Sequence, residues 1–184
     1  YFFILIGVFM QTIEHNANLL KRSFGRIDAI VFDFDGVLTN NLVYLVQDGK
    51  EMVSCSRADG LAFDVLRRIQ KPAYIISTEK NPVVTARANK LKIPVLQGIG
   101  NKTECLKELI DREKFDLKNI LYVGNDLNDL NAMKVCGFTA CPADSHEMIK
   151  SIATIVLKTK GGGGIVRELL ETVFQVNFIK ILNL

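Results

Sequence analysis

The chain has 184 residues, of which 48% are hydrophobic and 23% charged, a composition typical of one globular domain and not of a disordered chain. Lys and Arg number 23 against 20 Asp and Glu, and no basic block accompanies the small positive charge, so nucleic acid is not an expected partner. Four scattered cysteines without a CxxC pair indicate a reducing, cytoplasmic setting rather than a disulfide framework.

The first ten residues form the most apolar run of the chain. They are too few to span a bilayer as a helix, which takes about 20 residues, and they lack the flanks of a signal peptide. We therefore expect no membrane partner, and we interpret residues 1–26 as an N-terminal appendage that packs on the domain or on a partner. A core strand and a targeting remnant are the alternatives.

From residue 27 onward, short apolar runs alternate with helical periodicity. In chain order the pattern predicts a strand at 27–34, a hairpin of 43–46 and 51–54, a helix around 61–69, a strand at 73–77, a helix at 81–91, a strand at 95–97, a helix at 103–112, a strand at 120–123, and short elements at 127–135, 138–140, 145–149, 155–157 and 165–176. This alternation predicts an α/β fold, a three-layer Rossmann-like parallel sheet with helices on both faces. The expected domain covers residues 27–176, and residues 177–184 are a C-terminal tail.

Two aspartates follow the first predicted strand. Side chains alternate along an extended backbone, so Asp33 and Asp35 point to the same side while Phe34 turns into the core. Two carboxylates about 6–7 Å apart repel each other unless a cation lies between them, and oxygen ligands of this kind suit Mg²⁺. The alternative is an Asp-rich turn without function.

Polar residues also end the later strands, which right-handed crossovers bring to the same edge. Ser77 offers a hydroxyl and Lys102 an ammonium to a phosphate, although such residues also cap helices or face solvent. A second acidic cluster follows the fourth strand and contains Asn125, Asp126 and Asp129; its simpler interpretation is a helix N-cap.

The run Asp-Phe-Asp-Gly-Val-Leu-Thr at 33–39 resembles the signature of the haloacid dehalogenase superfamily of phosphohydrolases, and the likeness covers roughly residues 27–170. The resemblance implies that Asp33 is the nucleophile and Asp35 the general acid/base. It further implies phosphate binding by Ser77 and Lys102, and a Mg²⁺ ion held by Asp33, Asp35, Asn125 and Asp126. Asp129 either supports the metal shell or orients Lys102.

Finer features are similar to a capless subgroup, the phosphatases of 3-deoxy-D-manno-octulosonate 8-phosphate and of sialic-acid-type nonulosonate 9-phosphates. Segments 56–60, 77–81 and 161–168 carry this likeness, and only a β-hairpin occupies the place of a cap domain. The resemblance implies a homotetramer in which a neighbour's hairpin or tail completes each active site. Arg57 and Arg167 are candidates for binding the sugar-acid carboxylate; the alternative for both is a surface arginine.

Two departures from the subgroup pattern stand out. Asn125 occupies the first acidic position of a motif that usually reads Gly-Asp-Asp, so either its amide oxygen or Asp126 ligates the metal. The loop that begins Ser-Thr-Glu-Lys at 77–80 differs from the Thr-Gly-Arg common in the octulosonate enzymes, which slightly favours a nonulosonate substrate. The glycines at 161–164 are interpreted as a close-packed turn rather than a flexible linker.

The sequence thus predicts a Mg²⁺-dependent sugar phosphatase that works through an aspartyl-phosphate intermediate. One alternative is a weakly active or non-catalytic oligomerisation domain, related to the one fused to sialic acid cytidylyltransferases. A phosphotransferase or mutase is a third possibility, but such enzymes normally need a cap to exclude water.

Overall fold

The computed structural model describes residues 23–184, so the apolar run and most of the expected appendage lie outside the described residues. At the start of the described part, Phe24 packs on Phe174 with ring centroids 4.9 Å apart.

Six parallel strands form one sheet in the order β5-β4-β1-β6-β7-β8. Their bounds are β1 (Ala29–Phe32), β4 (Ala73–Ile76), β5 (Val95–Leu96), β6 (Ile120–Val123), β7 (Phe138–Cys141) and β8 (Ile155–Val156). The chain moves outward from β1 through β4 to β5 and then returns to β6 on the other side of β1. Ligands of open α/β sheets bind beyond the carboxyl ends of the strands at such a reversal.

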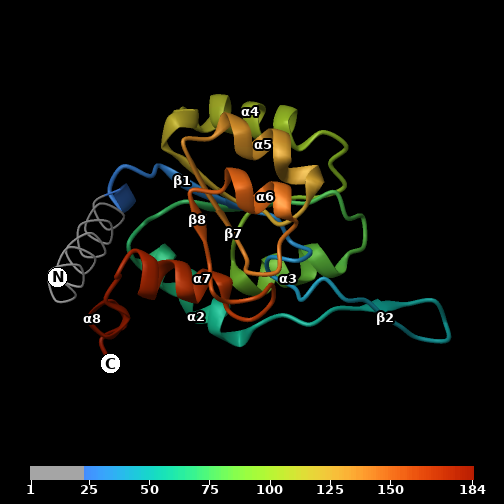
Figure 1. Ribbon diagram of the computed structural model, residues 1–184. Helices are drawn as coiled ribbons and strands as arrows, with labels where there is room; N and C mark the ends of the chain where they lie inside the picture. The colour runs from blue at the N-terminus through green and yellow to red at the C-terminus, as the bar shows by residue number, and fades with distance from the viewer. Residues whose placement is uncertain (1–22) are drawn as a thin grey trace, which may run out of the picture.

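Helices cover both faces of the sheet (Figure 1). One face carries α2 (Arg57–Arg68), α3 (Val83–Leu91) and α7 (Ile165–Glu168), and the other carries α4 (Lys102–Glu113), α5 (Leu130–Val135) and α6 (Glu147–Ile152). The alternation of side chains along β1 explains the two layers, because Ile30 and Phe32 lie in the first core whereas Ala29 and Val31 lie in the second. The sequence-predicted three-layer α/β fold is therefore confirmed.

A two-stranded hairpin, β2 (Tyr44–Leu45) and β3 (Glu51–Met52), extends away from the body of the domain (Figure 1). It replaces a cap domain, as predicted, and turns at Asp48 and Gly49, whose φ is +80°. None of the helices within residues 23–184 is both long and apolar enough to cross a membrane.

Several element bounds differ from the predicted ones. The predicted element at 127–135 is a 3-10 turn, η2 (Leu127–Asp129), followed by α5, and a second 3-10 turn, η1 (Leu117–Asn119), precedes β6. The final predicted helix is α7 followed by a π turn, η3 (Leu169–Val173). The expected tail contains a further helix, α8 (Phe178–Leu182), with Phe178 buried in the core.

The start of α3 also differs from the prediction. The Asn-Pro pair at 81–82 predicts Asn81 as the N-cap and Pro82 as the first helical residue, but α3 begins one residue later at Val83. Asn81 still has the expected role, because its side-chain Oδ1 accepts a hydrogen bond from the Val83 N–H at 3.1 Å.

Candidate active site

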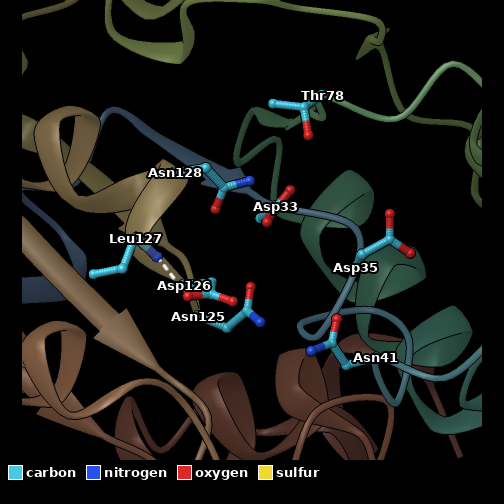
Figure 2. Close-up of a pocket in the computed structure, with 8 residues that line it drawn as sticks. All are labelled: Asp33, Asp35, Asn41, Thr78, Asn125, Asp126, Leu127 and Asn128. Atoms are coloured by element: carbon cyan, nitrogen blue, oxygen red, sulfur yellow. Dashed lines mark hydrogen bonds between the residues drawn. The ribbon is translucent and has the colours of Figure 1, made fainter.

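A cavity of about 320 Å³ opens beyond the carboxyl ends of β1 and β6. Polar side chains from the loops that follow β1, β4 and β6 dominate its lining (Figure 2). The lining residues are Asp33, Asp35, Asn41, Thr78, Asn125, Asp126, Leu127 and Asn128. The edge predicted from strand ends is therefore a real cavity, and both predicted acidic clusters contribute to it.

The loop after β1 places both aspartates on the cavity side (Figure 2). The Asp33 N–H continues the sheet by donating to the Val123 carbonyl at 2.9 Å, and Phe34 is fully buried in the core. The backbone then turns at Gly36, where φ is +79° and a Cβ would lie 1.9 Å from Nδ2 of Asn125. Only glycine fits this close approach, so the position of Gly36 fixes how the two acidic clusters meet.

Lys102 supplies a buried positive charge beneath Asp33. It is the first residue of α4, and its Nζ lies 2.7 Å from Oδ1 of Asp33 and 2.7 Å from Oδ1 of Asp129, with all three side chains at most 5% exposed. Burial alone would lower the pKa of Lys102, but the two carboxylates outweigh it and raise that pKa. The ammonium is therefore charged.

Asp129 holds this arrangement together. Its Oδ1 accepts hydrogen bonds from Lys102 and from the Tyr122 hydroxyl, and its Oδ2 accepts from the backbone N–H groups of Asn125 and Asp126. Asp129 is fully buried and is not among the cavity-lining residues. It therefore orients Lys102 and the loop after β6, which is one of the two roles that the sequence left open for it.

Burial raises the pKa of Asp33 to about 8, with a further contribution from the charge of Asp129, although Lys102 and the Phe34 N–H act in the opposite direction. Burial, with the charge of Glu79, also raises the pKa of Asp35. The Thr39 hydroxyl donates a hydrogen bond to Oδ1 of Asp35 at 3.4 Å. For Asp35, a raised pKa suits a carboxyl group that exchanges protons near neutral pH.

Asn125 bears on whether a cation fits this site. Its Oδ1 is buried and has no hydrogen-bond partner, although Asn125 lines the same cavity as Asp33 (Figure 2). An unpaired buried amide oxygen is costly unless something outside the protein binds it. Within residues 23–184, no three His, Cys, Asp or Glu side chains form a metal site by themselves. An oxygen set of Asp33 and Asn125 therefore fits a hard cation such as Mg²⁺, with further ligands from the loops.

Asp126 has a different environment from Asn125. Its side chain accepts a hydrogen bond from the Leu127 N–H at 2.7 Å and caps the 3-10 turn η2, and it is exposed. Asp126 nevertheless lines the cavity, so it can contribute negative charge there.

Besides Lys102 and Asp129, three of the predicted site residues lie outside the cavity lining. Ser77 is 1% exposed and its hydroxyl accepts a hydrogen bond from the Glu79 N–H at 3.1 Å. Arg57 is exposed at the start of α2. Arg167 pairs with Glu171 and lies over the ring of Phe178. The structure thus brings the predicted acidic and lysine residues together, but not the two arginines.

The predicted set of site residues omits four residues that line the cavity: Asn41, Thr78, Leu127 and Asn128. Thr78 could have been found, because it directly follows Ser77 at a strand end. Asn41 has a φ of +61°, and a single asparagine in a loop gives no sequence signal for such a conformation. Its place in the cavity depends on the path of the loop that leads into the hairpin.

The glycines at 161–164 form the close-packed turn that the sequence predicted. The Gly162 N–H donates to the Val37 carbonyl at 3.0 Å. A Cβ on Gly161 would lie 2.2 Å from the Gly36 carbonyl oxygen, and one on Gly162 would lie 2.5 Å from the Asn40 nitrogen. The turn therefore packs directly on the backbone of the loop that carries Asp35.

A carboxylate backed by a buried lysine at the switch point of a parallel sheet is an arrangement expected of an enzyme that hydrolyses phosphate esters. Comparison with known proteins agrees with this class. Residues 68–169 match the model of the haloacid dehalogenase-like hydrolases. The 3-deoxy-D-manno-octulosonate 8-phosphate phosphatase of Escherichia coli K12 is 31% identical over 146 residues, which are 79% of this chain and 78% of the relative.

Solved structures show the same likeness. A hydrolase of this family from Streptomyces avermitilis is 43% identical, with a TM-score of 0.78 over 80% of this chain and 84% of that one. The 3-deoxy-D-manno-octulosonate 8-phosphate phosphatase of Moraxella catarrhalis, solved with magnesium, phosphate and KDO, is 26% identical, with a TM-score of 0.80 over 90% and 93% of the chains. The present chain belongs to the haloacid dehalogenase-like hydrolases. It is an enzyme of the phosphoric monoester hydrolase type.

Proposed function

We propose that this chain is a Mg²⁺-dependent phosphatase of a sugar-acid phosphate, of the 3-deoxy-octulosonate 8-phosphate or nonulosonate 9-phosphate type. The observation that carries the proposal is the contact between Lys102 and Asp33 at the buried base of a cavity that Asp35 and Asn125 also line. A phosphate monoester is a dianion, so a pair of carboxylates can receive it only if positive charge lies beside them.

Asp33 acts as the nucleophile. Its carboxylate attacks phosphorus in line, the bond to the sugar oxygen breaks, and an aspartyl-phosphate forms, which water then hydrolyses. Lys102 neutralises charge on the phosphoryl oxygens, and Ser77 with the backbone of its loop binds another of these oxygens. A Mg²⁺ ion held by Asp33, Asn125 and the Asp35 loop, with Asp126 nearby, supplies further charge neutralisation when bound.

Asp35 acts as the general acid and base. It protonates the sugar oxygen as that group leaves and later removes a proton from the attacking water. The raised pKa of Asp35 supports the first role. The contact with the Thr39 hydroxyl keeps the carboxyl group on the cavity side.

The relatives support the substrate class, because the phosphatases from Escherichia coli and Moraxella catarrhalis both carry the octulosonate phosphate in their names. The nonulosonate alternative rests on the loop at 77–80, which lacks the Thr-Gly-Arg of the octulosonate enzymes. Arg57 and Arg167 are the proposed partners of the sugar-acid carboxylate, reached across a subunit boundary.

We also propose a homotetramer in which the hairpin of one subunit reaches a neighbour. Five consecutive apolar residues of the hairpin, 42–46, are between 45% and 73% exposed, and Met52 is 53% exposed. Exposed apolar surface of this extent on a projecting element is typical of an interaction surface. The four free cysteines support a reducing compartment such as the cytoplasm.

The test is a phosphatase assay with octulosonate 8-phosphate, a nonulosonate 9-phosphate and a hexose phosphate. We expect a clear preference for one of the sugar-acid phosphates, loss of activity on chelation with EDTA, and recovery on addition of Mg²⁺.

Asp33→Asn should abolish turnover without unfolding the protein, whereas Asp111→Asn, an exposed change on α4, should have no effect. Equal, weak activity on all three substrates would favour the non-catalytic oligomerisation domain instead.

A further inference from the structure

A buried carboxylate outside the cavity is not used by the chemistry described above. Asp59 lies in the first turn of α2 and is 2% exposed. Its Oδ1 accepts hydrogen bonds from the backbone N–H groups of Val166 at 2.8 Å and Arg167 at 3.2 Å, at the start of α7. Asp59 therefore ties α2 to α7, two helices that pack on each other on the same face of the sheet.

The segment before α7 is the glycine turn, which packs on the loop of the acid/base residue. Gly162 donates to the Val37 carbonyl, and the turn lies too close to the backbone of residues 36–40 to admit a Cβ at Gly161 or Gly162. Because Asp59 fixes the start of α7, and with it the glycine turn, it limits how far the loop at 36–40 can move away from the cavity on that side.

The segment before α2 holds the same loop on its other side. Thr39 pairs with Cys55 in an isolated antiparallel bridge. The next residue, Ser56, caps α2 through its hydroxyl, and its carbonyl accepts a hydrogen bond from the Arg87 guanidinium at 2.7 Å. Thr39 also donates to Asp35 and accepts from the Gly36 N–H. Asp59 thus lies between the two supports of the Asp35 loop.

We infer that Asp59 is a positioning residue, which holds the glycine turn and the start of α2 together so that the loop at 36–40 keeps Asp35 aimed at the leaving group. This inference rests on the proposed function. Asp59 does not touch the substrate. Its effect should appear where proton donation by Asp35 matters, since general acid catalysis is worth about 10²–10⁴ in rate.

Two substrates separate this role from a general loss of structure. The alcohol of the sugar-acid phosphate that the enzyme prefers must be protonated as it leaves, whereas the nitrophenolate of p-nitrophenyl phosphate leaves without a proton. In Asp59→Ala we expect kcat/KM, which reports the phosphoryl-transfer step, to fall about ten-fold more for the sugar-acid phosphate than for p-nitrophenyl phosphate. Asp59→Asn keeps an acceptor oxygen and should restore the wild-type ratio. Asp64→Ala, a part-exposed change on the same helix, should leave both rates unchanged.

Hydrogen exchange gives a readout that does not depend on activity. In Asp59→Ala the amides of residues 36–41 and of Gly162 should exchange faster than in the wild type and in Asp59→Asn, whereas those of β6 should not. If Asp59→Ala does not fold, Gly162→Ala disturbs the same contact from the turn, where φ is +68°, and should give the same selective loss.

An equal fall for both substrates, or unchanged exchange in residues 36–41, would overturn the positioning role. Wild-type protein that hydrolyses neither ester would instead overturn the proposed function, and the exchange measurement would still decide whether Asp59 holds the loop.

Discussion

Replacement of Lys102 by methionine tests the buried charge cluster most directly. Methionine has a similar shape but no charge, so Asp33 and Asp129 would lose an ammonium 2.7 Å from each of them. Breaking a buried ion pair by removing one partner costs about 3–5 kcal/mol, and here one cation serves two carboxylates that are at most 5% exposed. The expected loss is a large fraction of the stability of about 5–15 kcal/mol typical of a domain.

Urea denaturation followed by circular dichroism measures this loss. With a denaturant slope of about 2 kcal/mol per molar, the midpoint of Lys102→Met should fall by about 2 M. Because burial raises the pKa of Asp33 to about 8, the variant can bind a proton at Asp33, so the difference from wild type should be smaller at about pH 6 than at about pH 9. Turnover should fall by about 10²–10³, as for loss of other groups that stabilise transition-state charge.

Lys107→Met is the matched control, since Lys107 is exposed on the same helix and surface changes are usually within about 0.5 kcal/mol. A loss in Lys102→Met no larger than in this control would refute the assignment of Lys102 as the counter-charge of the two aspartates.

Three further predictions concern single residues. Asn125→Asp adds a charged oxygen where the unpaired amide oxygen lies, so Mg²⁺ should bind more tightly. The measurement is the rise in melting temperature at equal Mg²⁺ concentration, which should be larger than in the wild type. An unchanged or smaller rise would mean that the side-chain oxygen of residue 125 does not face the cation. Burial raises the pKa of Asp59 from 3.8 to about 6, so its stabilising contribution is full below about pH 3.8 and is lost as the pH rises through about 6. Between about pH 3.8 and 6, the free energy of unfolding of the wild type should therefore fall by up to about 3 kcal/mol relative to that of Asp59→Asn, measured by urea denaturation. Parallel curves of this free energy against pH would argue against a raised pKa of Asp59. Gly36→Ala should lower the free energy of unfolding by about 1–3 kcal/mol and weaken Mg²⁺ binding, because the added Cβ would overlap the Asn125 amide at a φ of +79°. Normal Mg²⁺ binding in a titration would contradict the close contact between Gly36 and Asn125.

The local pattern of the chain was enough to predict the layers of the fold and the main chemistry. Strand ends are set by nearby residues, and in a parallel sheet all of these ends meet at one edge, so Asp33, Asp35, Lys102 and Asn125 could be assigned to one site before any coordinates. The bounds of β6 were also predicted as found, because a run of four buried apolar residues between Asn119 and Gly124 has little freedom.

Other features depended on contacts between segments far apart in the sequence. The roles of Asp129 and Asp126 were ambiguous from spacing alone, and only packing decided that one bonds to Lys102 while the other caps a turn. The link from Asp59 to α7 joins residues more than 100 positions apart, which no local periodicity can indicate.

By itself, the sequence determined which groups lie at the edge of the sheet, because the alternation of strands and helices places strand ends together whatever the side chains between them. Tertiary structure alone decided which of these groups touch, which atom is left without a partner, and what braces the loop. Those outcomes depend on close approaches between backbones such as those of Gly36 and Gly161, where an added Cβ would lie 2.2 Å from the Gly36 carbonyl oxygen. Close packing, not residue type, sets such distances.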